Sequence, residues 1–200
     1  MRLHPEIFAI FDEICRRRKA GGDVLEIGAR PRPDTLLRLP SLSGARSCVG
    51  IDLDGPHDCG TFTILRGNAN RMAMFERGSF DTVVCNSVLE HDPAFWRTLA
   101  EVGRVLRPGG LFVVGVPGFG RMNTIPRGAD EPADTKRPEW LLASAPVLGL
   151  HEFPRDYYRF SARAVHDVFL AGLDEREVRE AMLPPRLVGA GRTRTATAAP

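Results

Sequence analysis

The chain has 200 residues, of which 43% are hydrophobic and 26% are charged. These values predict one globular α/β domain and exclude a disordered chain, a collagen or a coiled-coil rod. A net charge of +2 is too small to indicate a nucleic-acid or membrane partner, and no apolar run approaches the roughly 20 residues that span a bilayer. The N-terminus lacks a signal-peptide pattern and the four cysteines are far apart, so we expect a cytoplasmic protein without disulfides.

The first half of the chain is predicted to contain one helix and most of a parallel sheet. Apolar residues repeat at helical spacing after Pro5 and predict an amphipathic helix over residues 5–19. Short apolar segments follow, and those that are continuously apolar are typical of strands buried on both faces. The predicted strands are residues 24–27, 47–51, 61–65, 80–85 and 111–116.

Helix signals alternate with these strands. Asp92 is a candidate cap for a helix that the glycine-rich turn at 107–110 ends. A further helix is predicted to begin at Ser161 and end at Gly172. Its inward-facing residues are expected to be Val165, Val168 and Phe169. The alternation predicts a single Rossmann-like, doubly wound α/β domain over residues 1–191, with helices on both faces of the sheet.

Two stretches depart from this alternation. Residues 118–150 are rich in glycine and proline, and a long segment without regular elements is often a functional lid, here over the acceptor site. Residues 192–200 have nothing to bury, so we expect a disordered tail.

The residues that follow the predicted strands indicate a nucleotide-like ligand. In an open parallel sheet, ligands bind beyond the carboxyl ends of the strands. Asp52 closes the second strand, where a carboxylate can accept both hydroxyls of a ribose. Gly28 follows the first strand and lets a ligand approach the backbone. Asn68 follows the third strand and offers a donor and an acceptor to an adenine edge.

The first loop also discriminates between cofactors. A nicotinamide fingerprint needs glycines at positions 28, 30 and 33, but Arg30 and Pro33 stand at the last two. No glycine-rich triphosphate loop of the G-x-x-x-x-G-K-[ST] type is present either. Glu26, inside the first strand, suits a cofactor with a positive charge and no phosphate. S-adenosylmethionine is such a molecule.

Six segments in order resemble the class I S-adenosylmethionine-dependent methyltransferase family. They are Val24-Leu25-Glu26-Ile27-Gly28, Val49-Gly50-Ile51-Asp52, Gly67-Asn68-Ala69, Gly78-Ser79-Phe80-Asp81-Thr82-Val83-Val84, Val88-Leu89-Glu90-His91 and Arg104-Val105-Leu106-Arg107-Pro108-Gly109-Gly110. Each segment alone is a weak signal, and their common order over residues 20–118 is a strong one. The stretch from His151 to Ser161 resembles a subgroup of small bacterial members, of the type 11 methyltransferase domain.

This resemblance implies a fold, a cofactor and a set of site residues. The fold is a mostly parallel sheet of seven strands, the last two near residues 176–182 and 186–190. The cofactor is S-adenosylmethionine. Its implied binding residues are Glu26, Gly28, Asp52, Leu53, Asn68, Ala69 and Asn86. The single glycine of the first loop departs from the two or three that are usual in the family.

The expected function is therefore methyl transfer to an oxygen or nitrogen of a small molecule, such as a sugar or natural-product intermediate. His151 and Asp156 are candidate catalytic residues, because a histidine oriented by a carboxylate can remove a hydroxyl proton near neutral pH. No metal site is evident in the sequence. Two alternatives remain open at this stage: a methyltransferase-like binding subunit with weakened catalysis, and a nicotinamide-dependent oxidoreductase.

Overall fold

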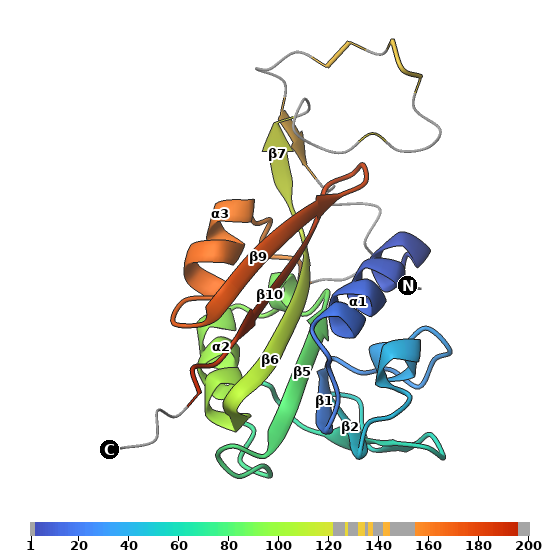
Figure 1. Ribbon diagram of the computed structural model, residues 1–200, viewed down its shortest axis with the longest axis vertical. Helices are drawn as coiled ribbons and strands as arrows, with labels where there is room; N and C mark the ends of the chain where they lie inside the picture. The colour runs from blue at the N-terminus through green and yellow to red at the C-terminus, as the bar shows by residue number, and fades with distance from the viewer. Residues whose placement is uncertain are drawn as a thin grey trace.

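The computed structural model describes residues 3–121, 127, 132–134, 136–137, 142–144 and 155–195. Short strands and helices alternate along the chain (Figure 1). The strands are β1 (Asp23–Ile27), β2 (Ser47–Asp52), β3 (His57–Asp58), β4 (Thr63–Arg66), β5 (Phe80–Asn86), β6 (Leu106–Pro117), β7 (Phe119–Arg121), β8 (Leu142–Ser144), β9 (Asp174–Ala181) and β10 (Arg186–Arg192). The α-helices are α1 (Pro5–Arg17), α2 (Phe95–Val105) and α3 (Ala162–Ala164). Shorter turns of helix are η1 (Leu36–Arg38), η2 (Pro40–Leu42), η3 (Leu89–His91) and η4 (Val165–Phe169).

Eight strands form the main sheet in the order β3-β4-β2-β1-β5-β6-β10-β9. The central strands from β4 to β6 are parallel, whereas β10 pairs antiparallel with both β6 and β9. The fold class predicted from the sequence is thus confirmed. The eighth strand is β3, a two-residue edge strand antiparallel to β4 that carries no strand signal of its own.

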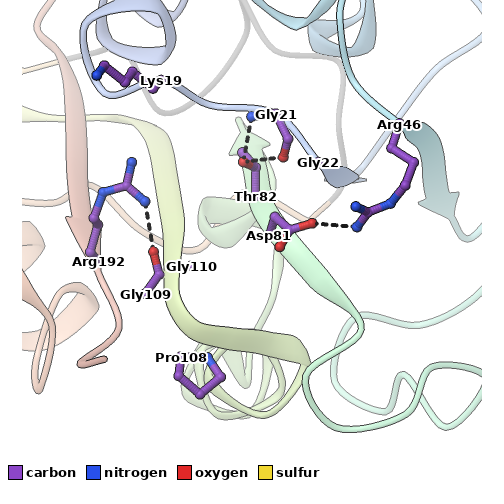
Figure 2. Close-up of a pocket in the computed structure, with 10 residues that line it drawn as sticks. All are labelled: Lys19, Gly21, Gly22, Arg46, Asp81, Thr82, Pro108, Gly109, Gly110 and Arg192. Atoms are coloured by element: carbon purple, nitrogen blue, oxygen red, sulfur yellow. Dashed lines mark hydrogen bonds and ion pairs between the residues drawn. The ribbon is translucent and has the colours of Figure 1, made fainter. Parts of the chain in front are cut away.

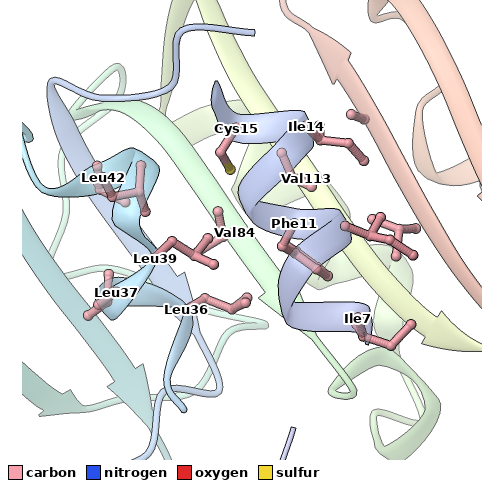
Figure 3. Close-up of a cluster of buried hydrophobic side chains, with 14 of the residues drawn as sticks. Ile7, Phe11, Ile14, Cys15, Leu36, Leu37, Leu39, Leu42, Val84 and Val113 are labelled. Carbon is pink, nitrogen blue, oxygen red and sulfur yellow. The ribbon is translucent and has the colours of Figure 1, made fainter. Parts of the chain in front are cut away.

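The sheet separates two hydrophobic cores because successive strand residues point to opposite faces. Helix α1 lies on one face, and α2 and α3 lie on the other (Figure 1). Figure 3 shows the first core, where Phe11 and Ile14 of α1 pack with Leu36 of η1 and with Val84 and Val113 of the sheet. The second core holds alternate residues of the same strands. Its members include Leu25, Val83, Cys85, Phe112, Val102, Val165 and Phe169.

The boundaries of α2 differ from the prediction. The helix begins at Phe95, and Asp92 is not its N-cap. Asp92 instead accepts the backbone N–H of Ala94 at 2.9 Å and the hydroxyl of Thr98 at 2.8 Å, a local turn that precedes the helix. At the other end, the predicted turn 107–110 is part of β6, whose register with β5 shifts between Phe80 and Thr82.

The helix predicted from Ser161 is also reorganised. Ser161 caps it as expected, accepting the N–H of Ala164 at 3.1 Å. After α3 the backbone widens to a π turn, in which Leu170 donates to the carbonyl of Val165 five residues earlier. This widening turns Val168 outward to 52% exposure, so its predicted inward orientation is wrong, while Val165 and Phe169 are buried as expected.

The C-terminal segment is ordered further than we expected. Arg192 is the last residue of β10, and its guanidinium donates to the carbonyl of Gly109 at 2.7 Å. Thr193 bonds Gly110 through its backbone N–H. The prediction of a disordered tail from residue 192 is therefore wrong for Arg192 and Thr193. Both residues continue the antiparallel pairing with β6. Most of the predicted lid at 118–150 lies outside the described residues, apart from the pairing of β7 with β8.

Candidate active site

The loops after β1 and β2 lie against each other at the carboxyl edge of the sheet. The backbone N–H groups of Gly28 and Ala29 both donate to the carbonyl of Ile51, at 2.8 and 3.1 Å. Gly28 has φ +77°, and a Cβ atom there would lie 2.2 Å from Cγ2 of Val88. Only glycine fits this conformation and this contact, so the position of Gly28 is fixed by the packing of the loops after β1 and β5.

Asp52 ends β2 beside this loop, as the sequence predicts. Its Oδ1 accepts the N–H of Asp54 at 2.9 Å, and its Oδ2 lies 3.3 Å from Nε of Arg30. Arg30 also contacts Asp54 at 2.9 Å. The guanidinium from the first loop thus lies next to the carboxylate that the sequence assigns to a ribose, a neighbour that the sequence did not reveal.

Apolar and polar groups suited to an adenine ring surround the next strand end. Leu53 is 58% exposed directly after Asp52, and Met74 is exposed with its methyl group over Gly67. Asn68 is exposed, and its side-chain oxygen accepts the N–H of Asn70 at 2.9 Å. Ala69 packs against the second core. The ends of two neighbouring strands therefore bring together four side chains whose polar and apolar groups fit an adenosine. These are Asp52, Leu53, Asn68 and Ala69.

Glu26 has different contacts from those expected of a residue that touches the cofactor. Its buried carboxylate accepts the hydroxyl of Thr35 and the N–H groups of Leu36 and Leu37, at 3.2 and 3.1 Å. Burial raises the pKa of Glu26 to about 7, although these three hydrogen bonds act in the opposite direction. Glu26 holds the start of η1 in place and so positions the segment that follows Gly28.

Asn86 and Ser87 form the carboxyl end of β5. Asn86 donates to the hydroxyl of Ser87 at 3.1 Å and faces Gly115 of β6. A Cβ at Gly115 would lie 2.3 Å from Oδ1 of Asn86 and 2.8 Å from the ring of Phe11. The glycine therefore makes room for the Asn86 side chain at the carboxyl end of β5.

The structure describes only one of the two candidate catalytic residues. His151 lies outside the described residues. Asp156 is nearly buried and bonds both terminal nitrogens of Arg159, at 2.5 and 2.6 Å. A carboxylate in a two-point ion pair is fixed in direction, which suits a structural role.

Two charged residues at the same edge have no role in the predictions made from the sequence. Glu90 is 1% exposed within η3, and Arg186 opens β10 opposite Pro117, the last residue of β6. Glu90 is part of the segment Val88-Leu89-Glu90-His91, which resembles the methyltransferase family but carries no predicted role for Glu90. Arg186 is nearly 100 residues away in sequence, so no local pattern could have brought the two together.

A pocket of about 320 Å³ lies at the opposite, amino edge of the strands (Figure 2). Arg46 and Asp81 face each other across it, and Arg192 donates to Gly109. Because the expected ligand residues follow the strands at the carboxyl edge, this pocket does not coincide with the expected cofactor site.

Neither a metal site nor a membrane-spanning helix is found in the part of the chain that the structure describes. No three histidine, cysteine or acidic side chains there are grouped closely enough to hold a metal ion. No described helix has the length and apolar character needed to cross a membrane.

Comparisons with known proteins match this site and fold. Residues 39–114 match the methyltransferase domain family. Over 96 residues the chain is 32% identical to the ubiquinone/menaquinone biosynthesis C-methyltransferase UbiE of Methylobacterium nodulans, a match that covers 45% of this chain and 38% of that protein. The chain therefore spans less than half the length of this curated relative.

Two solved structures share the fold at low sequence identity. One is the 1,6-didemethyltoxoflavin-N1-methyltransferase of Burkholderia thailandensis, with a TM-score of 0.63, 20% identity, and coverage of 94% of this chain and 78% of that one. The other is the [4+2]-cyclase SpnF, with a TM-score of 0.64, 12% identity, and coverage of 98% and 84%. The matching sequence segment and the shared fold confirm the resemblance of this chain to the class I S-adenosylmethionine-dependent methyltransferases.

Proposed function

We propose that this protein transfers a methyl group from S-adenosylmethionine to an oxygen or nitrogen of a small-molecule acceptor. The observation that carries the proposal is the Asp52 carboxylate at the end of β2, next to the Gly28 loop and to exposed Leu53. A carboxylate beside a glycine turn and an apolar surface fits an adenosine without phosphates. In the toxoflavin methyltransferase, S-adenosylhomocysteine and a small molecule are bound on the same fold.

Each cofactor-site residue has a role in this proposal. Asp52 accepts the ribose hydroxyls, which requires Arg30 to give up its contact with Oδ2. Leu53, Asn68 and Ala69 contact the adenine, and Asn86 lies near the sulfonium. Glu26 acts through the loop that it positions. The bound cofactor supplies a methyl group already activated by the sulfonium, so the chain mainly has to orient the acceptor and exclude water.

The nature of the acceptor atom is the finer part of the proposal. The residues after β5 are Asn86-Ser87-Val88-Leu89, which lack the Asn/Asp-Pro-Pro-aromatic pattern that aligns a nucleobase amine. A small-molecule hydroxyl or amine is therefore the first candidate, with His151 as the proposed base. A carbon acceptor is the second candidate, because the relative at 32% identity is a C-methyltransferase.

Calorimetric titration with S-adenosylhomocysteine tests the cofactor assignment. Asp52→Ala removes charge-assisted hydrogen bonds to the ribose, so we expect the affinity to fall by on the order of 1.5–3 kcal/mol, or roughly 10- to 150-fold. Asp54→Ala is the matched control, since it removes a neighbouring carboxylate that also contacts Arg30 but is 68% exposed. Equal affinity of the Asp52→Ala variant and the parent protein would show the assignment to be wrong.

A further inference from the structure

Glu90 is a buried carboxylate without a hydrogen-bond partner. Both of its side-chain oxygens are enclosed, and neither bonds any donor. Glu26, the other deeply buried glutamate of this edge, binds three donors. An enclosed carboxylate without partners costs several kcal/mol when it is ionised. Burial accordingly raises the pKa of Glu90. A buried carboxylate that lacks partners is therefore a candidate for binding a ligand.

The cations around Glu90 do not neutralise it by direct contact. Nε2 of His91 lies 3.9 Å from Oε1 of Glu90, too far for a hydrogen bond, and its Nδ1 bonds the carbonyl of Arg155 at 2.6 Å. Arg159 is engaged in its two-point ion pair with Asp156. Arg186 forms no ion pair with any carboxylate of the described residues.

Arg186 is the second unmatched charge. It is half-buried, and its guanidinium makes one long contact, 3.4 Å to the hydroxyl of Ser87. Burial lowers the pKa of Arg186, although the nearby Glu90 carboxylate acts in the opposite direction. Ser87 itself has φ +53°, a strained conformation for a residue other than glycine. Arg186 therefore reaches Ser87, next to Asn86, and its charge interacts with that of Glu90 three residues further along the chain.

The position of this pair is that of an acceptor site. Ser87 follows β5, and Arg186 reaches across β6 from its antiparallel partner β10. The segment 155–160, which follows the predicted lid in the chain, lies next to Glu90. Tyr157 and Tyr158 of that segment donate their N–H groups to the backbone carbonyl of Glu90, at 2.8 and 3.3 Å.

We propose that Glu90 and Arg186 together bind the methyl acceptor, and that this acceptor is an anionic molecule carrying both a hydroxyl or amine and a carboxylate or phosphate. The hydroxyl or amine donates a hydrogen bond to Glu90, and the anionic group pairs with Arg186. This inference rests on the proposed methyl transfer, since it specifies the substrate class of that site. Because Glu90 is only 1% exposed, the segment 155–160 has to move aside when the acceptor binds.

The test is calorimetric binding to the parent protein saturated with S-adenosylhomocysteine. The probes are 2-, 3- and 4-hydroxybenzoate, lactate, glycerate and 3-hydroxyphenyl phosphate, with the methyl ester of each carboxylate as its neutral counterpart. We expect at least one acid to bind tenfold or more tightly than its ester, as a charge-assisted contact requires. Arg186→Gln should abolish this preference, and Glu90→Gln should weaken the acid and the ester alike. Arg163→Gln, at a 90% exposed arginine, is the matched control.

Three outcomes would overturn the inference: no probe binds, acid and ester bind equally, or Arg186→Gln keeps the preference for the acid. Failure of the proposed function is seen separately, because S-adenosylhomocysteine would then not bind in the first titration. Hydrogen exchange at Tyr157 and Tyr158 gives a readout independent of catalysis. Exchange there should increase when an acid binds, and unchanged exchange on binding would contradict the required movement of the segment 155–160.

Discussion

Two groups of charged residues at opposite edges of the sheet are bonded in opposite ways. At the amino edge, Asp23 and Asp81 are both bonded by Arg46 and Arg107, with contacts of 2.5–2.9 Å. At the carboxyl edge, Glu90 has no hydrogen-bond partner and Arg186 has one contact at 3.4 Å. Both edges carry carboxylates and guanidinium groups, so composition does not explain the difference.

We interpret the paired charges of Asp23 and Asp81 as structural, and the unpaired charges of Glu90 and Arg186 as ligand-binding. Matched pairs at the amino edge fix the ends of β1, β5 and β6 relative to one another. Unmatched charges at the carboxyl edge reduce stability, and a protein gains from keeping them only when a ligand completes their bonding. The pocket of Figure 2 lies at the amino edge, where Arg46 and Asp81 of its lining are paired with each other.

The largest expected effect is a difference in pH dependence between the edges. The pKa of Glu26 is raised to about 7, so its contribution to stability is full below the unfolded pKa of about 4.3 and is lost as the pH rises through 7. The loss is on the order of 3 kcal/mol. The guanidinium of Arg46, aided by Ser47 and Arg107, holds the pKa of Asp23 well below its usual range. The contribution of Asp23 is therefore present above about pH 4 and is lost on acidification.

Urea unfolding between pH 2 and pH 8 measures the free energy of unfolding over the range in which Asp23 (acid limb) and Glu26 (neutral limb) each change it. Glu26→Gln should flatten the fall in unfolding free energy between pH 5 and pH 8, and Asp23→Asn should flatten the acid limb. Glu76→Gln, at an exposed carboxylate, is the control. A Glu26→Gln variant with the parent's slope above pH 5 would contradict the assignment of this limb.

The next effect concerns the amino edge alone. Asp81 accepts the N–H of Asp23 at 2.8 Å as well as both guanidinium groups. Asp81→Ala should lower the free energy of unfolding by on the order of 1–2 kcal/mol, because these contacts are partly exposed. Asp81→Asn retains an acceptor for the backbone N–H and should lose less. Affinity for S-adenosylhomocysteine should stay unchanged in both, and a loss of affinity would show that this edge is not purely structural.

The smallest effect is expected at the carboxyl edge. Glu90→Gln removes an enclosed charge that has no partner, so thermal unfolding at pH 7 should occur at the same temperature or slightly higher, by up to about 1 kcal/mol of stability. The comparison with Asp81→Asn is direct, since each variant replaces one carboxylate by its amide. A clear loss of stability in Glu90→Gln would mean that the Glu90 carboxylate has stabilising partners in the folded protein. The contrast between the two edges would then not hold.

The sequence by itself determined the fold and the strand ends that carry the proposed cofactor residues. Continuous apolar segments identify buried strands because side-chain burial follows local periodicity. Gly28, Asp52 and Asn68 could be found because each comes directly after such a strand, and parallel strands bring their carboxyl ends to one edge. The π turn that exposes Val168 could not be found, since its helical spacing reads as an ordinary helix.

Only the tertiary structure decided what the charged residues do. Glu26 reads as a cofactor residue in the strand, but folding brings the N–H groups of η1 to its carboxylate. Asp156 reads as a partner for His151, yet it bonds Arg159 three residues away. Arg186 reaches Ser87 because β10 pairs antiparallel with β6, although the two residues are 99 positions apart in the sequence. Whether a charge is paired depends on atoms brought together over such distances, and no local pattern in the chain records them.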